Sequence, residues 1–250
     1  LEQSPNQQTL VFLEDLARIA QQAQQLKLAS LGRLTAGISH EIRNPLGAIS
    51  HAAQLLGESE ELDSADRRLT QIIQDHSQRM NRVIENVLQL SRRQQSAPQR
   101  LDLKPWLENF VTESRMQATE RQKIHLRINS GDFATLMDPN QLTQILDNLL
   151  RNGWRHSAML HDQAEVWLAL FIDPESQLAV LEVQDNGPGV PLDQQAHLFE
   201  PFFTTSSQGT GLGLYLSREL CESNQARLDF NPRQGGGCFR ITFAHGRKQS

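Results

Sequence analysis

The chain has 250 residues, of which 38% are hydrophobic and 21% charged, so a packed core is feasible and a fully disordered chain is not expected. The formal net charge is −5 and no long basic run occurs, which excludes the electrostatic pattern of nonspecific nucleic-acid binding. The two cysteines, Cys221 and Cys238, predict a reduced cytosolic protein, and the longest apolar run, Val166–Ile172, is too short to span a bilayer.

The first predicted element is a segment with its own apolar stripe, Leu16, Ile19, Ala23 and Leu26. Its phase does not continue into the following leucines, so either the coiled-coil register shifts here or two separate helices meet. Before it, Thr9–Leu13 could be the last strand of an upstream sensor domain. Because the chain begins at Leu1 rather than at a methionine, we expect a fragment of a longer protein.

The helical pattern continues to about Arg93, and the polar, acidic stretch Gly57–Asp66 predicts a turn between two long helices. Each helix carries an apolar seam, and a hairpin alone cannot bury both seams. We therefore expect two chains to pair their hairpins in a homodimeric four-helix bundle. The seams consist of Leu31, Leu34, Ile38, Ile42, Pro45, Ile49, Ala52 and Leu56 on the first helix, and of Leu69, Ile73, His76, Met80, Val83, Val87 and Leu90 on the second.

A histidine followed by an acid, His40-Glu41, lies on the first helix about 200° from the neighbouring seam residues, so His40 is predicted to face solvent. A neutral imidazole is a competent nucleophile near pH 7, and Glu41 can orient its ring or take its proton. Asn44 lies one turn further on the same face, where it could position a water, and Pro45 should loosen the helix.

Two other histidines lie on these helices, and one of them, His51, is the alternative acceptor. His51 lies within about 20° of the same face as His40, but alanines follow it instead of an acid, which favours a surface residue. His76 falls on the seam of the second helix, which favours a packed core residue.

After a predicted linker at Gln94–Arg100 the pattern changes to mixed strands and helices, which predicts an α+β layer sandwich. The predicted strands are Leu101–Leu103, Ile124–Ile128, Ala134–Met137, Val166–Ile172, Leu178–Val183, Arg227–Phe230 and Cys238–Phe243, and the predicted helices are Pro105–Thr119, Asn140–Gly153 and Leu212–Ser223.

Asn148 and Asn152 are separated by one turn, so both amides project from one face of a predicted helix. Amide oxygens are hard ligands of the kind that Mg²⁺ accepts beside waters and phosphates. Asparagine is a poor helix former, so two on one face suggest a role, although two solvated asparagines are the alternative.

The turn Asp185-Asn186-Gly187-Pro188-Gly189 directly follows a hydrophobic strand. Its glycines permit close approach of a flat ligand, and the carboxylate of Asp185 can accept the exocyclic amino group of adenine. Asp-Asn-Gly is also simply a good turn, which stays the alternative explanation.

A glycine-rich stretch, Gly209-Thr210-Gly211-Leu212-Gly213, opens a predicted helix whose free N–H groups could bind phosphate. It lacks the Lys-Ser/Thr of a P-loop and the context of a dinucleotide fold. The preceding stretch, His197–Gln208, ends in polar residues that include Thr204 and Thr205, and it could form a lid over the phosphates.

The ordered set of these motifs resembles that of the two-component sensor histidine kinases, over residues 28 to 243, with the nearest similarity to the nitrogen-regulation and type IV pilus-regulation sensors. The motifs are SHEIRNPL, QILDNLLRN, DNGPG, LFEPFFTT and GTGLGL, which resemble the H, N, G1, F and G2 boxes of that family. The resemblance implies a dimerisation and phosphotransfer hairpin followed by an α/β-sandwich ATP-binding domain of the gyrase/Hsp90/histidine kinase/MutL type.

The resemblance also implies a role for each motif residue. His40 would be the phosphoacceptor, Glu41 its base, Asn44 a phosphatase residue, and Asn152 the ligand of Mg²⁺, supported by Asn148. The ATP contacts would come from Asp185, Gly187, Gly189, Gly209, Gly211 and Gly213, together with Arg155 and His156. The phosphoryl group would pass to an aspartate of a response-regulator receiver domain, which this chain lacks.

Two departures from the family pattern affect the nucleotide pocket. Gly153 replaces a usual alanine and should loosen the end of its helix, and Ser206 replaces a usual lysine of the lid, which removes a phosphate contact. A Ser/Thr protein kinase with the same ATP fold and a nucleotide-switched dimeric scaffold remain the alternative functions.

These patterns divide the chain into five parts: 1–27 as a sensor remnant and signalling helix, 28–96 as the hairpin, 97–103 as a linker, 104–246 as the ATP-binding domain and 247–250 as a tail. We expect a cytoplasmic fragment without direct contact to nucleic acid or membrane, and a full-length protein anchored in the bacterial inner membrane.

Overall fold

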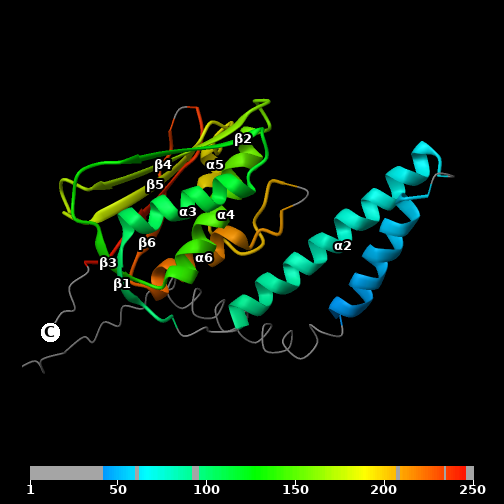
Figure 1. Cartoon of the computed structure of the whole chain (residues 1–250), viewed down its shortest axis with the longest axis horizontal. Helices are drawn as coiled ribbons and strands as arrows, with labels where there is room; N and C mark the ends of the chain where they lie inside the picture. The colour runs from blue at the N-terminus through cyan, green and yellow to red at the C-terminus, as the bar shows by residue number, and fades with distance from the viewer. Residues whose placement is uncertain (1–41, 60–61, 92–95, 207–208, 234, 246–250) are drawn as a thin grey trace, which may run out of the picture.

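A computed structural model describes residues 42–59, 62–91, 96–206, 209–233 and 235–245 (Figure 1). These residues form a helical hairpin and an α/β domain. The features predicted within residues 1–41, which include the sensor remnant, the register shift, His40 and Glu41, lie outside the described residues. In the described part, no helix is both long enough and apolar enough to cross a membrane.

The hairpin consists of a helical segment at residues 42–57 and of α2 (Ser64–Ser91), so the predicted turn between two helices is confirmed. The Asp63 side chain accepts hydrogen bonds from the backbone N–H groups of Ala65 and Asp66, both at 2.8 Å, and thereby caps the start of α2. The first helix continues through Pro45.

The two helices pack against each other through a narrow stripe of small and apolar residues. Leu46 and Ala53 are buried, and they lie seven residues apart, which is two helical turns. A Cβ atom added at Gly57 would lie 3.5 Å from Oγ1 of the buried Thr70 on α2, which fixes the antiparallel register. The same spacing continues along α2, where Thr70, Ser77 and Ile84 are buried.

The predicted seam largely occupies a different side of the hairpin from this internal contact. His76, which we predicted to be a packed core histidine, is exposed in the single chain. The two helices contact each other through the stripe of Leu46 and Ala53, so most described seam residues are not covered by the other helix of the same hairpin. Its exposed members include Ile42, Ile49, Leu56, Leu69, Ile73 and Met80.

The α/β domain follows the predicted order of elements, with small shifts at their ends. Its strands are β1 (Gln99–Asp102), β2 (Gln122–Ile128), β3 (Ala134–Met137), β4 (Ala164–Ile172), β5 (Ala179–Asp185), β6 (Arg227–Phe230) and β7 (Cys238–Thr242). Its helices are α3 (Leu103–Gln117), α4 (Pro139–Ser157), α5 (Leu192–Gln195) and α6 (Gly213–Ser223). β1 lies partly in the predicted linker because it pairs antiparallel with β3, and the short α5 was not predicted.

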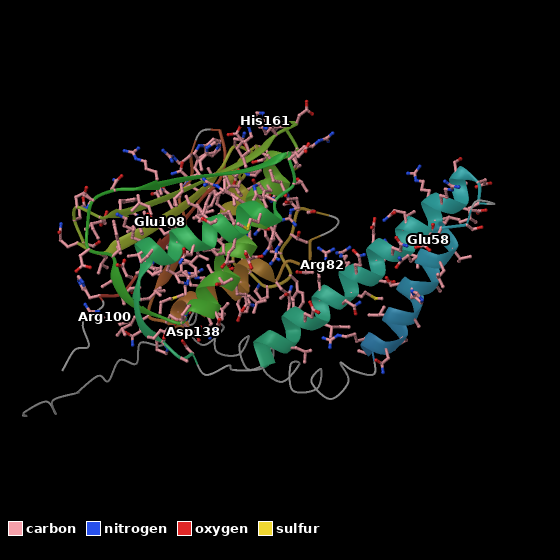
Figure 2. All side chains as sticks on the ribbon, viewed as in Figure 1. Glu58, Arg82, Arg100, Glu108, Asp138 and His161 are labelled. Atoms are coloured by element: carbon pink, nitrogen blue, oxygen red, sulfur yellow. The ribbon has the colours of Figure 1, made fainter. Side chains whose placement is uncertain are left out.

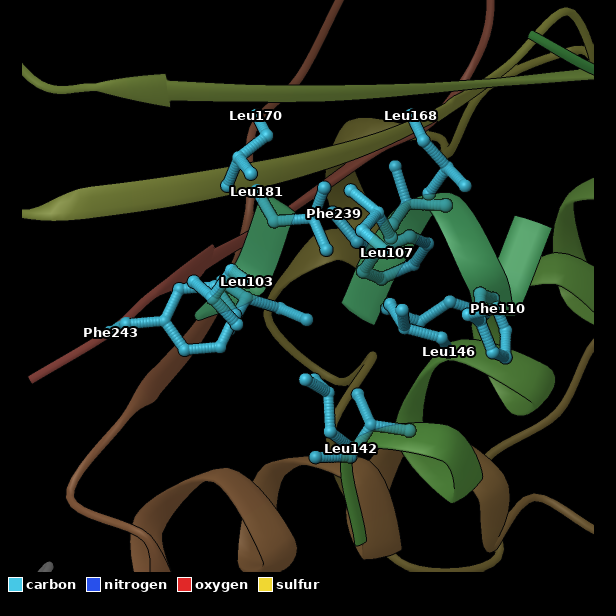
Figure 3. Packing of buried hydrophobic residues seen from close by; sticks show 14 of the residues in the cluster. Leu103, Leu107, Phe110, Leu142, Leu146, Leu168, Leu170, Leu181, Phe239 and Phe243 are labelled. Carbon is cyan, nitrogen blue, oxygen red and sulfur yellow. The ribbon is translucent and has the colours of Figure 1, made fainter. Parts of the chain in front are cut away.

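A five-stranded sheet in the order β2-β4-β5-β7-β6 forms one layer, and α3, α4 and α6 cover one of its faces (Figure 1). Only the β2–β4 pair is parallel among the described strands of this sheet. The core lies between the helices and the sheet, where leucines of α3 and α4 meet the strands (Figure 3). The predicted α+β sandwich is therefore confirmed.

The helix that carries the two asparagines passes very close to the sheet at Gly153. α4 does not end there, as predicted, but continues to Ser157. A Cβ atom on Gly153 would lie 2.7 Å from Cγ2 of Val166 on β4 and 3.4 Å from Cβ of Asp185. Gly153 thus sets the distance between α4 and β4, a role that helix propensity alone does not reveal.

We expect the substitution Gly153→Ala to destabilise the α/β domain by about 1 kcal/mol. Overpacking against the stiff Val166 side chain costs about 1–3 kcal/mol, and the gain in helix propensity of about 1 kcal/mol offsets only part of it. Denaturant unfolding would measure the effect. Gly47→Ala is the matched control, because its Cβ would meet nothing within 4 Å and should stabilise its helix by about 1 kcal/mol. An equal gain at both glycines would contradict the role of Gly153.

Candidate functional site

Helix α4, which carries the two asparagines, is capped at its start and bonded to α6 along one face. Asp138 caps its start by accepting from the backbone N–H groups of Asn140 and Gln141, and Pro139 occupies its first turn. Asn148 donates from Nδ2 to Oγ of Ser217 on α6 at 3.0 Å. Asn148 therefore joins α4 to α6, while Asn152 lies one turn further along.

Asn148 also lies against the start of α6. A Cβ atom on Gly213 would collide with Oδ1 of Asn148, so only glycine permits this approach. The Oδ1 atom of Asn152 accepts from Nη2 of Arg155 at 3.0 Å. A hard amide oxygen is thus held next to a fixed cation, an arrangement that suits a phosphate–metal pair.

Asp185 ends β5 and is held by backbone donors from two separate segments. Its Oδ1 accepts from the N–H of Gly187 at 2.9 Å and from the N–H of Gly237 at 3.1 Å. A Cβ atom on Gly237 would lie 2.7 Å from Oδ2 of the same carboxylate, and one on Gly236 would collide with the Asp185 carbonyl oxygen. These glycines let backbone approach the carboxylate closely, so its direction is fixed.

Gly236 and Gly237 are functional candidates that the sequence analysis missed. The signal was present as three consecutive glycines, Gly235–Gly237, directly before β7. Gly236 also contacts the predicted Gly189, whose φ of +74° favours glycine. The hairpin before β7 therefore belongs to the same site as the Asp185 turn.

The last turn of α4 brings Arg155 and His156 to the Asp185 turn. A Cβ atom on Gly187 would lie 2.8 Å from the backbone carbonyl carbon of His156. Burial lowers the pKa of His156, the Arg155 charge lowers it further, and Asp185 opposes both effects. Burial, followed by the charge of Arg82 on α2, lowers the pKa of Arg155. Figure 2 shows Arg82 on the side of α2 that faces the α/β domain.

The lid and the glycine-rich loop are joined through their backbones. Phe202 donates its N–H to the Gly211 carbonyl at 2.9 Å, and Phe202 has a φ of +67°. Gly211 has a φ of +70°, and a Cβ there would collide with the Phe202 backbone. Gly209 donates to the carbonyl of Ser206 at 3.1 Å. Thr204 and Thr205 of the lid are exposed, as a phosphate contact requires.

The start of α6 has no side-chain cap, because Leu212 occupies the N-cap position. The first N–H groups of this helix consequently have no partner within the helix, and its dipole favours an anion. A phosphate site at the glycine-rich loop stays a prediction. This loop is also the part of the domain that touches the hairpin.

Two contacts join α2 to this loop. Asn86 donates from Nδ2 to Oγ1 of Thr210 at 3.0 Å, and Val83 packs against the buried Leu212 and Leu216. Asn86 was not among the predicted site residues, because no local pattern in the sequence marks it. The hairpin therefore contacts the glycine-rich loop and the start of α6 through α2.

A hollow of about 340 Å³ borders the same turn from the other side of the sheet. Trp167 pairs with Gln184 in the sheet register, and both face away from α4, toward which the neighbouring Val166 points. In this hollow Asn186 has a buried Oδ1 without a partner among the described residues. The predicted residues of α4 and α6 do not line this hollow, but Asp185 does, together with Gly236 and Gly237, so the hollow adjoins the Asp185 turn.

The structure thus brings together most of the predicted nucleotide residues around α4, the Asp185 turn and the glycine-rich loop. Asn44 is described and exposed on the hairpin, whereas His40 and Glu41 lie outside the described residues. Within the described part, no group of three or more His, Cys, Asp or Glu side chains could hold a metal ion. A metal here would depend on an amide such as that of Asn152 and on ligand oxygens.

Two protein-family models match the chain. Residues 30–96 match the His Kinase A (phospho-acceptor) domain, and residues 137–247 match the histidine kinase-, DNA gyrase B- and HSP90-like ATPase. The first match covers the hairpin and the second covers most of the α/β domain.

Curated relatives are similar to this chain in sequence. Sensor protein kinase PilS of Pseudomonas aeruginosa is 67% identical over 251 residues, which cover 100% of this chain and 47% of that protein. Sensor histidine kinase ZraS of Escherichia coli K12 is 32% identical over 214 residues, which cover 84% of this chain and 44% of that protein. The chain therefore spans about half the length of the curated relatives it matches.

Solved structures share the fold. Full-length ShkA in complex with AMPPNP has a TM-score of 0.61 at 23% identity, covering 84% of this chain and 45% of that one. Histidine kinase ThkA in complex with the response regulator TrrA has a TM-score of 0.64 at 19% identity, covering 92% of this chain and 67% of that one. At these identities the likeness establishes the fold.

Proposed function

This chain belongs to the two-component sensor histidine kinases, and we propose that it transfers the γ-phosphoryl group of ATP to its own His40. The observation that carries the proposal is the contact between α2 and the glycine-rich loop, through Asn86 and Val83. This contact holds the phosphate end of the proposed nucleotide site against the hairpin that carries the proposed phosphoacceptor.

The register of the hairpin supports this assignment. Gly57 lies beside Thr70, and the same number of residues separates Gly57 from Asn44 as separates Thr70 from Val83. In two antiparallel helices of equal rise, Asn44 consequently lies at the level of Val83. Val83 contacts the glycine-rich loop, and His40 precedes Asn44 by four residues in the sequence.

The chemistry assigns one role to each group. The His40 ring nitrogen forms a bond to the γ-phosphorus while the bond to the bridging oxygen breaks, and ADP leaves. Glu41 takes or holds the proton of the other ring nitrogen. Asp185 accepts a hydrogen bond from the adenine amino group. Positioning of the reacting groups supplies most of the rate enhancement in such transfers.

The remaining nucleotide contacts are assigned to the loop and to α4. The N–H groups at the start of α6 bind phosphate oxygens, and Arg155 neutralises their charge. Asn152 offers the amide oxygen for Mg²⁺, which would offset the charge on the phosphates when bound. Thr204 and Thr205 of the lid complete the phosphate contacts.

We further propose that two chains pair through the exposed seam of the hairpin. Ile42, Ile49, Ile73 and Met80 are exposed in the single chain at 38% to 49%, and a second hairpin would bury them. The phosphoryl group would then pass to an aspartate of a response-regulator receiver domain. Asn44 would position a water that hydrolyses the phosphorylated aspartate to inorganic phosphate. Anchoring of a longer protein in the bacterial inner membrane stays a prediction.

Incubation with γ-labelled ATP and Mg²⁺ tests the proposed reaction. We expect the chain to take up a label that acid removes and base does not, because a phosphoramidate is acid-labile. A label that resists acid and is lost in base would instead indicate a hydroxyl acceptor and a Ser/Thr kinase. Nucleotide binding without any label would favour the nucleotide-switched scaffold.

A further inference from the structure

Two residues that follow the hairpin form hydrogen bonds to the α/β domain. Ser96 donates from Oγ to Oδ1 of Asn224 at 2.8 Å. The next residue, Ala97, donates its backbone N–H to Oδ2 of Asp138 at 3.0 Å. The linker, by which we mean residues 92–98 between α2 and β1, is therefore bonded to the domain at Ser96 and Ala97, before β1 begins.

The two acceptors are buried and lie at the ends of both nucleotide helices. Asp138, which is 7% exposed, caps the start of α4, and Figure 2 shows it at the edge of the domain. Asn224, which is 3% exposed, ends α6. Asn224 accepts from the backbone N–H of Asp138 at 2.9 Å and donates to Oε1 of Gln141 at 2.6 Å. One buried polar network thus joins the linker, α4 and α6.

This network lies at the opposite end of α6 from the contact with α2. Val83 packs against Leu212 and Leu216 near the start of α6, whereas Ser96 bonds to Asn224 at its end. The hairpin and its linker consequently hold α6 at both ends.

The fastening also shortens the connection between the two parts of the chain. Only residues 92–95 separate Ser91, the end of α2, from Ser96, whereas residues 92–98 would separate it from Gln99 of β1 if the contacts were lost. Each added residue extends the possible reach by about 3.3–3.6 Å. A longer connection lowers the effective concentration of one part at the other.

We propose that Ser96 and Asn224 are positioning residues for phosphoryl transfer, which fasten the linker to the α4–α6 network and so keep the nucleotide pocket next to the hairpin. This inference rests on the proposed function, because positioning matters only if His40 receives the phosphoryl group. It assigns the linker an active part, since its hydrogen bonds set how far the pocket can move from the hairpin.

The substitution Ser96→Ala tests the inference in the full chain. We expect the Ala97 amide to exchange its hydrogen about fivefold faster, the typical effect of losing one hydrogen bond. The autophosphorylation rate at saturating ATP should fall by at most about twofold, the limit that the −3/2 power of connection length sets when both the Ser96 and the Ala97 contacts are lost. The ATP concentration for half-maximal rate should not change, because no nucleotide contact is lost.

Ser223→Ala is the matched control. The Ser223 hydroxyl donates a hydrogen bond to Oε1 of Gln141 and accepts one from Asn224 in the same network, but Ser223 does not belong to the linker. It should change neither exchange at Ala97 nor the saturated rate. A second variant, Asp138→Asn, keeps an acceptor for the α4 cap but places an amide toward Ala97, and should reproduce the effect of Ser96→Ala.

The outcomes separate this inference from the proposed function. A faster rate in Ser96→Ala would overturn the inference, because the contact would then hold an inactive arrangement. Unchanged exchange at Ala97, or an equal effect of Ser223→Ala, would also overturn it. If the native chain takes up no label but Ser96→Ala still speeds exchange, the fastening stands while the positioning role and the proposed function both fail.

Discussion

Replacing His40 by glutamine should abolish the acid-labile label on this chain while ATP binding stays unchanged. Glutamine is similar in size to histidine and polar, but it has no ring nitrogen that can attack phosphorus. The nucleotide site consists of residues on α4, the Asp185 turn and the glycine-rich loop, so it stays complete. Labelling with γ-labelled ATP and a direct nucleotide-binding measurement on the same samples would show both results.

His51→Gln is the matched control for this experiment. His51 is an exposed histidine of the helical segment at residues 42–57, and no acidic residue follows it. Its replacement should leave the label intact. A label that persists in His40→Gln and disappears in His51→Gln would transfer the phosphoacceptor role to His51. A loss of ATP binding in His40→Gln would show that the substitution damages more than the acceptor.

The sequence predicted the elements of the α/β domain well because their signals are local. β4 was expected at Val166–Ile172 and observed at Ala164–Ile172, and the alternation of buried and half-buried residues along it follows from the two faces of a strand. Helix α6 was placed within one residue, since its glycine-rich start and apolar face lie next to each other in the sequence.

The contacts that complete the site could not be predicted because they join distant segments. Gly237 donates to Asp185 across 52 positions, and Asn86 donates to Thr210 across 124. No periodicity connects such residues. Gly153 is a further example, because the low helix propensity of glycine predicted a looser helix end. The structure shows instead that Val166, thirteen positions away, leaves room only for glycine. The exposure of His76 could not be predicted for a related reason. A heptad pattern predicts an apolar seam, but it does not say whether the same chain or a second chain covers that seam.

Asp185→Asn should lower the affinity for ATP by about tenfold to a hundredfold while the domain stays folded, because a hydrogen bond to a charged group contributes about 1.5–3 kcal/mol. The amide oxygen of asparagine can still accept from Gly187 and Gly237, but its NH₂ group then faces the ligand as a donor. A donor cannot bind the adenine amino group, yet it can bind the carbonyl oxygen that inosine carries at the same position. The preference for ATP over ITP should therefore shrink or reverse in Asp185→Asn.

Asp173→Asn is the control, since Asp173 accepts from Ser176 in a turn and pairs with Arg240 at the far end of β4, and it should leave both affinities unchanged. Equal losses of ATP and ITP in Asp185→Asn would instead mean that this carboxylate only holds its turn, because a purely structural defect has no means of distinguishing the two bases.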